Sequence, residues 1–75
     1  MGTIKDSEEL GRLIRQERKA QGLTQMELAA LTGVGLRFLR ELELGKESCR
    51  LGLAFKVMAS LGLACEIRSR TERRT

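Results

Sequence analysis

The feature that most constrains the fold of this chain is the segment of residues 23–46, because its glycines divide it into two short helices. Thr24 and Glu27 have the spacing of a capping box, which predicts that a helix begins at Thr24. Gly33 is predicted to end this helix in a left-handed conformation, and Gly35 to cap the helix that follows. The sequence therefore predicts two helices joined by a glycine-centred turn, with side chains at the start of the second helix free to face outward.

A longer helix is predicted before this segment. Asp6 or Ser7 caps it, and Gly22 ends it, with basic residues in the last turns. Its buried stripe, at helical spacing, is predicted at Leu10, Leu13 and Ile14. The chain has two Phe and no Trp, Tyr or Pro. Its core is therefore built from Leu, Ile, Val, Ala and Met, which suits helices better than sheets.

A further helix is predicted from about Leu51 to Leu61, and Gly62 ends it. Its buried stripe is predicted at Leu51, Ala54, Phe55, Met58 and Leu61. Leu53 and Val57 lie off this stripe, so the helix is apolar over much of its circumference. Such a helix is buried on more than one side, which in a chain of 75 residues predicts contact with a partner.

After Gly62 the apolar residues change from helical spacing to strand spacing. In residues 63–68, one face of a strand carries Leu63, Cys65 and Ile67. A single strand leaves its backbone groups without partners, so we expect it to pair with the same strand of a second copy across a two-fold axis. Pairing within the chain, with residues 3–5, is the alternative. Dimer contacts are thus predicted at Leu53, Val57, Leu63, Cys65 and Ile67.

The expected fold is a mainly α, compact domain of four to five helices with one C-terminal β-strand. It divides into a helical domain at residues 7–62, a dimerisation strand at 63–68 and a basic tail at 69–75. The net charge is +4, with basic residues gathered in residues 10–22 and from residue 68 to the end. Two basic patches on an otherwise balanced domain fit nucleic-acid binding, and a merely solvated surface is the alternative.

Several other classes of function lack the residues that they need. Without His, and with only Cys49 and Cys65 far apart, the chain offers no metal-ligand set and no base or activated thiol for catalysis. The two cysteines make no disulfide framework and are expected to be reduced. No apolar run approaches the length of a membrane span, and the N-terminus lacks a signal-peptide pattern. We expect a cytoplasmic protein that is not an enzyme and needs no cofactor.

The two short helices have the layout of a helix-turn-helix, whose second helix fits the major groove of DNA. Thr24 and Gln25 stand at the N-terminus of the preceding helix, where backbone N–H groups favour a phosphate. Arg37 is the best candidate to read a base, because its guanidinium can bond guanine O6 and N7. Glu41, one turn later, either accepts a hydrogen bond from cytosine N4 or pairs with Arg37.

Other residues of this unit have less specific roles. Leu36 and Phe38 can pack on thymine methyl groups, although burial of Phe38 in the core is the alternative. Arg40 and Lys46 are placed for backbone phosphates. Arg18 and Glu43 are candidates for an ion pair that joins the first helix to the third.

The stretch RKAQGLTQMELAALTGVGLRFLRELELGK resembles the Xre-type (Cro/C1-type) helix-turn-helix family, and FKVMASLGLACEI is similar to the end of HipB-like antitoxins. The resemblance implies that Gln25 contacts phosphate and supports the first base reader. It also implies an ion pair between Arg18 and Glu43. Further implied contacts are with bases for Leu36, Arg37 and Glu41, and with phosphates for Arg40, Lys46 and Arg50.

The function implied by the resemblance is that of a dimeric repressor on an inverted-repeat operator in double-stranded DNA. A HipB-like chain is also expected to be the antitoxin of a type II toxin–antitoxin pair that represses its own operon, with a HipA-like kinase as the toxin. Two alternatives are open: an interaction module for which DNA binding is secondary, and a stand-alone repressor of the phage or plasmid type. The chain departs from the family pattern, which bears on the bases that it reads, at Gly35, Leu36, Phe38 and Arg50.

Overall fold

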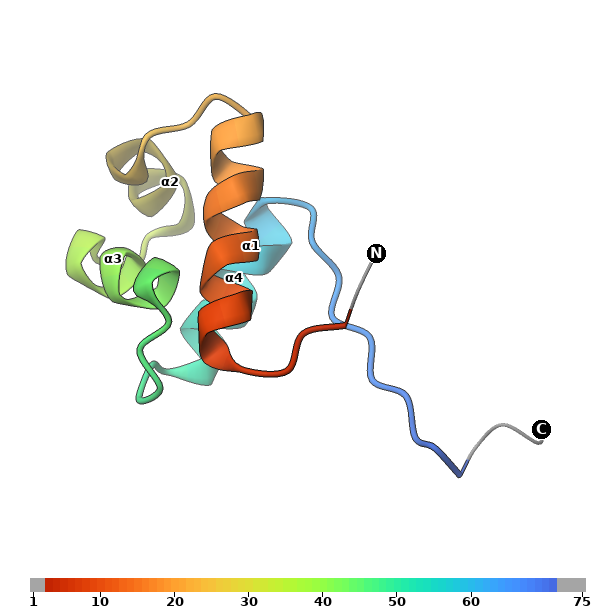
Figure 1. Ribbon diagram of the computed structural model, residues 1–75. Helices are drawn as coiled ribbons and strands as arrows, with labels where there is room; N and C mark the ends of the chain where they lie inside the picture. Colours follow the sequence, from red (N-terminus) through yellow and green to blue (C-terminus); the bar gives the residue numbers. More distant parts are fainter. Residues whose placement is uncertain (1–2, 72–75) are drawn as a thin grey trace.

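The computed structural model describes residues 3–71, and that part of the chain folds into four helices (Figure 1). They are α1 (Ser7–Ala20), α2 (Gln25–Thr32), α3 (Leu36–Leu44) and α4 (Leu51–Ser60). The predicted mainly helical fold is therefore confirmed, and each helix lies close to its predicted position.

The starts of α1 and α2 follow from the caps predicted in the sequence. The carboxylate of Asp6 accepts a hydrogen bond from the amide of Glu9 at 2.9 Å. At α2, the Thr24 hydroxyl accepts from the amide of Glu27 at 3.0 Å, and the Glu27 carboxylate accepts from the amide of Thr24 at 2.8 Å. Gly33 then ends α2 with a φ of 76°, in the left-handed region that glycine adopts without strain. Local chemistry thus determines where the turn between α2 and α3 begins.

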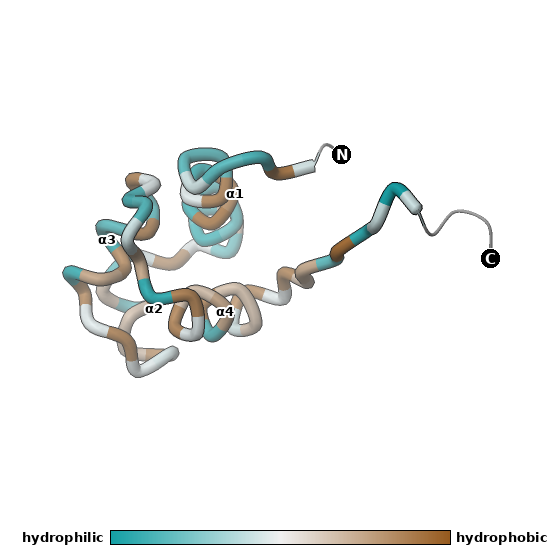
Figure 2. The backbone as a smooth tube through the Cα atoms, turned by 90° about the horizontal axis from the view of Figure 1, so that it is seen from below, coloured by the Kyte–Doolittle hydropathy of each residue, from teal (hydrophilic) through white to brown (hydrophobic). Residues whose placement is uncertain are grey.

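One apolar core lies among the four helices. α1 packs against α3, and α2 packs against both α3 and α4. Figure 2 shows α1 and α4 on opposite sides of the molecule, with α2 and α3 to one side of them. Val34, in the turn before α3, is also buried, so the turn is anchored to the core. The core comprises Ile14, Leu28, Ala29, Val34, Leu39, Leu42, Ala54, Val57, Met58 and Leu61.

The close approach of α1 to the end of α3 depends on a glycine that the sequence did not single out. A Cβ atom at Gly11 would lie 2.5 Å from the carbonyl oxygen of Leu42 and 2.6 Å from that of Glu43. Both distances are well inside van der Waals contact, so any side chain here forces the two backbones apart. Gly11 therefore sets how near α1, and the side chains that it carries, come to α3.

The predicted buried stripe of α4 is wrong at two positions. Leu51 is 64% exposed and Phe55 is 43% exposed, whereas Val57 is fully buried. Because α4 is apolar on nearly every side, the spacing alone does not decide which side faces the core. Val57 consequently belongs to the core of its own chain rather than to the dimer surface predicted for it. The face on the core consists of Ala54, Val57, Met58 and Leu61, the last just beyond the helix.

The C-terminal residues form no strand in the described part of the chain, residues 3–71, and pairing with residues 3–5 does not form there either. After α4 the chain runs away from the helices (Figure 1, Figure 2). Leu63 is half-buried against the core, while Cys65 and Ile67 are exposed. A strand needs a partner for its backbone groups, and these residues of a single copy supply none. Of the predicted basic tail, residues 72–75 lie outside the described residues.

Candidate nucleic-acid interface

The outer face of α3 carries the side chains predicted to read bases. Arg37 has 90% of its side chain exposed, and Arg40 is exposed nearly one turn later. Leu36 and Phe38 are half-buried and pack against the core. Burial of Phe38, the alternative that the sequence left open, is therefore partly realised. Only the outer part of these two apolar side chains is free to meet a base.

Glu41 lies between two cations on this face. Its Oε2 atom is 3.4 Å from Nε of Arg37 and 3.3 Å from Nζ of Lys46. The hydrogen bond from Lys46 is the main reason that the pKa of Glu41 lies below its ordinary value of 4.5, and Arg37 lowers it further. The pairing of Glu41 with Arg37, one of its two predicted roles, is thus formed. The carboxylate forms a surface ion pair with Arg37, whose side chain is otherwise exposed.

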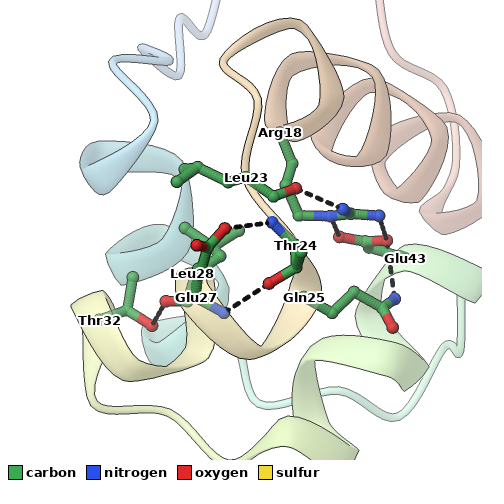
Figure 3. A network of polar contacts seen from close by, with 8 residues as sticks. All are labelled: Arg18, Leu23, Thr24, Gln25, Glu27, Leu28, Thr32 and Glu43. Carbon is green, nitrogen blue, oxygen red and sulfur yellow. Dashed lines mark hydrogen bonds and ion pairs between the residues drawn. The ribbon is translucent and has the colours of Figure 1, made fainter.

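Beneath this face lies the ion pair predicted between Arg18 of α1 and Glu43 of α3 (Figure 3). Nε of Arg18 donates to Oε2 of Glu43 at 2.7 Å, and Nη2 donates to Oε1 at 3.0 Å. Nη1 donates to the carbonyl oxygen of Leu23 at 2.7 Å. The side chains of Arg18 and Glu43 are only 8% and 3% exposed. A buried pair with two parallel hydrogen bonds restrains the orientation of both helices.

Gln25, predicted to contact phosphate at the start of α2, is joined to the same ion pair. Its Nε2 atom donates to Oε1 of Glu43 at 2.9 Å (Figure 3). Beside it, Thr24 uses both its hydroxyl and its amide in the capping box. The protein itself therefore orients the side chains at this N-terminus, while the helix dipole of α2 favours an anion in front of them.

An open cleft of about 690 Å³ lies between α1, the start of α2 and the end of α3. α1 contributes Arg15 and Lys19 to it, and α3 contributes Arg40 and Leu44. Neither Arg15 nor Lys19 was assigned a role from the sequence, although their spacing of four residues places both on one face of a helix. The remaining lining residues are Arg18, Leu23, Thr24, Gln25 and Glu43.

Lys46 and Arg50, the other residues predicted to contact phosphates, lie beyond the end of α3. Lys46 has 49% of its side chain exposed. Arg50 is exposed at the N-cap position of α4, where it makes no side-chain capping bond. Neither residue lines the cleft. The cations of this region therefore fall into two groups, one around the cleft and one along the connection from α3 to α4.

Metal sites, membrane spans and free thiols are the other features of residues 3–71 that bear on function. No cluster of three or more His, Cys, Asp or Glu side chains is placed there to hold a metal ion. No helix in the same residues is both long enough and apolar enough to cross a membrane. Cys49 and Cys65 are free thiols. Burial raises the pKa of the Cys49 thiol, whereas Cys65 is exposed.

Comparisons with known proteins agree with this geometry. A family model described as helix-turn-helix matches residues 14–66. An uncharacterized HTH-type transcriptional regulator of Sinorhizobium fredii, y4mF, is 44% identical over 71 residues, which cover 95% of this chain and 93% of that protein. An uncharacterized HTH-type transcriptional regulator of Methanothermobacter thermautotrophicus is 46% identical over 50 residues, covering 67% of this chain and 72% of that protein.

Solved structures with the same fold include a HipB–O4 20mer complex and a HipA–HipB–O2–O3 complex. Each matches with a TM-score of 0.84 at 24% identity, and covers 93% of this chain and 99% of the other. A HipB–O1–O2 complex matches with a TM-score of 0.83 at 25% identity, covering 92% of this chain and 100% of the other. The likeness extends over nearly the whole length of both chains, so the fold described here is that of HipB.

Proposed function

The chain belongs to the Xre-type (Cro/C1-type) helix-turn-helix family, and we propose that it is a sequence-specific repressor that binds an inverted-repeat operator as a homodimer. Its curated relatives are HTH-type transcriptional regulators, which supports the assignment to DNA-binding transcriptional regulators. The observation that carries the proposal is the outer face of α3. It presents exposed Arg37 and Arg40, and a buried network fixes α3 against α1 and α2.

In this proposal, α3 enters the major groove and the N-terminus of α2 meets a backbone phosphate. Arg37 bonds guanine, and Glu41 either orients Arg37 or accepts from a neighbouring cytosine. The exposed parts of Leu36 and Phe38 pack on thymine methyl groups. The phosphate contacts come from Thr24, Gln25, Arg40, Lys46 and Arg50.

One copy of α3 covers one half-site, so an inverted repeat requires two copies related by a two-fold axis. We propose that residues 63–68 pair with the same residues of a second copy. Support comes from Cys65 and Ile67, which are exposed on a segment that has no partner within residues 3–71. Leu53 and Leu63 are half-buried against the core. The exposed Leu51 and Phe55 take the place of Val57 in this proposed contact.

The test is binding to DNA from the chain's own promoter region against unrelated duplex, over a series of salt concentrations. Arg37→Ala is expected to relax specificity at one base pair, at a cost of about 1–3 kcal/mol. Arg40→Ala is expected to weaken binding to all sequences alike. Equal affinity of the wild-type protein for both duplexes refutes specific repression. Truncation after Gly62 should weaken self-association and DNA affinity together, and a truncated protein that stays fully dimeric refutes the strand pairing.

A second candidate function is that of an antitoxin, which we propose on the match to HipB over its whole chain, including the HipA–HipB–O2–O3 complex. The partner is then a HipA-like kinase, inhibited by direct binding, and repression of the shared operon follows. The test is co-purification with the product of an adjacent kinase-like reading frame and suppression of its toxicity. If the chain binds its operator but no such kinase binds the chain, the stand-alone repressor of the phage or plasmid type is correct.

A further inference from the structure

Three cations in the cleft have no acidic partner. Within residues 3–71, Arg15, Lys19 and Arg40 form no ion pair, whereas the cations beside Glu41 are paired. The one carboxylate that lines the cleft, Glu43, is already occupied by donors of the buried network. Uncompensated cations that surround a concave surface concentrate a positive potential there. The positive potential of the cleft therefore favours binding of an anion.

The cleft also offers an apolar surface beside these charges. Leu44, at the end of α3, is 81% exposed and lines the cleft together with the half-buried Leu23. An apolar surface adds nothing to the binding of a small free anion. In a nucleic-acid backbone, phosphates alternate with sugar rings that present carbon atoms, so an extended sugar–phosphate chain fits both the cations and the leucines. α1, α3 and the start of α2 all contribute residues to the lining of the cleft.

We propose that Arg15 and Lys19 hold phosphates of the DNA backbone beside the half-site, with Arg40 completing the cleft from α3. This inference rests on the proposed DNA-binding function and extends it, because α1 becomes part of the DNA interface. Contacts to phosphates set position and affinity but carry no direct base information. Arg15 and Lys19 therefore strengthen binding to operator and unrelated duplex by the same factor.

The test is the full-length double variant R15Q/K19Q, whose binding to operator and to unrelated duplex is measured over a series of salt concentrations. Each phosphate neutralised contributes roughly 0.9 to the slope of log affinity against log salt. The slope should become less negative by about 1 to 2, which is about 10- to 60-fold weaker binding near 0.1 M salt. The ratio of operator to unrelated affinity should not change. Both side chains are exposed, so the unfolding midpoint should be unaffected.

The matched control is K5Q/K56Q, which removes the same charge from two exposed lysines outside the cleft. Lys56 lies on α4, which contributes no residue to the cleft. The control should change the slope much less than R15Q/K19Q does. Ethylation of individual phosphates identifies the ones that Arg15 and Lys19 contact. Ethylation of such a phosphate next to the half-site should weaken wild-type binding and leave R15Q/K19Q binding unchanged.

The outcomes separate the two proposals. If the wild-type protein prefers its operator and R15Q/K19Q keeps the wild-type slope, the phosphate role of α1 is wrong and the repressor proposal stands. If the control changes the slope as much as R15Q/K19Q does, the effect is one of net charge and the cleft has no special role. If the wild-type protein binds no duplex, both proposals fail.

Discussion

The buried pair of Arg18 and Glu43 allows a quantitative prediction about what holds the interface together. Arg18→Met removes three hydrogen bonds and leaves the Glu43 carboxylate, 3% exposed, with the Gln25 amide as its remaining donor. Breaking a buried ion pair by deleting one partner costs about 3–5 kcal/mol, because the other charge stays buried without compensation. A domain of this size has roughly 5 kcal/mol of stability in total. We therefore expect Arg18→Met to keep only about 0–2 kcal/mol of stability and to be partly unfolded at 25 °C.

The double variant R18M/E43M distinguishes the buried charge from simple loss of packing. It removes both charges and fills the space with two apolar side chains of comparable length, a change that is often neutral for stability. The carbonyl of Leu23 and the amide of Gln25 lose their partners, at about 1 kcal/mol each where water does not replace them. We expect the double variant to be about 1–2 kcal/mol less stable than the wild type and clearly more stable than Arg18→Met.

The assay is urea unfolding followed by circular dichroism at pH 7 and one fixed protein concentration, because self-association shifts apparent stability. Glu41→Gln is the matched control, because it also removes a carboxylate from ion pairs of α3. The Glu41 side chain is 30% exposed, so these pairs lie at the surface. Its unfolding midpoint should stay close to that of the wild type. A cost below about 1 kcal/mol for Arg18→Met, or a double variant no more stable than the single one, refutes the reasoning from buried charge.

Three further predictions concern other parts of the structure. Gly11→Ala should destabilise the fold by about 1–3 kcal/mol despite better helix propensity, because its Cβ meets backbone oxygens of α3 at 2.5 and 2.6 Å; an unchanged thermal midpoint contradicts this. Lys46→Gln should raise the pKa of Glu41 toward its ordinary value, since the hydrogen bond from Lys46 is the main cause of the lowered pKa. The Glu41 pairing should add stability above the ordinary pKa and lose it as pH falls through the lowered one. NMR titration of the carboxyl group measures this, and a midpoint that Lys46→Gln leaves unmoved is the contrary result. At pH 8, iodoacetamide should modify Cys65 before Cys49, whose pKa burial raises; equal rates by mass spectrometry would be inconsistent with that burial.

The helices could be predicted because each one begins or ends at a residue whose effect is local. Asp6 and Thr24 accept hydrogen bonds from amides three residues later, and Gly33 adopts the left-handed conformation that ends α2 without strain. The side of α4 that faces the core could not be predicted in the same way. Its apolar residues form two stripes, and either one could pack on the core. Only the positions of the other helices decide which one does.

The same distinction applies to the interface: a contact within one helix could be predicted from the sequence, and contacts between separate segments could not. Arg37 and Glu41 are four residues apart on one helix, so their pairing follows from helical geometry. The cleft that includes Arg15 and Arg40 requires α1 and α3 to meet, and no periodicity within either segment encodes that meeting. The strand expected at residues 63–68 is harder still to predict from the sequence, because its hydrogen bonds depend on a second chain.

A single carboxylate connects stability to the proposed contacts with DNA. Glu43 holds Arg18, which fixes α1 and its cleft residues, and also holds Gln25 at the start of α2. In R18M/E43M the apolar pair replaces the packing but gives no direction to Gln25 or to the angle between α1 and α3. That variant should therefore remain folded and yet bind operator more weakly than its folded fraction explains. If its affinity, corrected for folded fraction, equals that of the wild type, then packing alone orients the interface and the buried ion pair serves stability only.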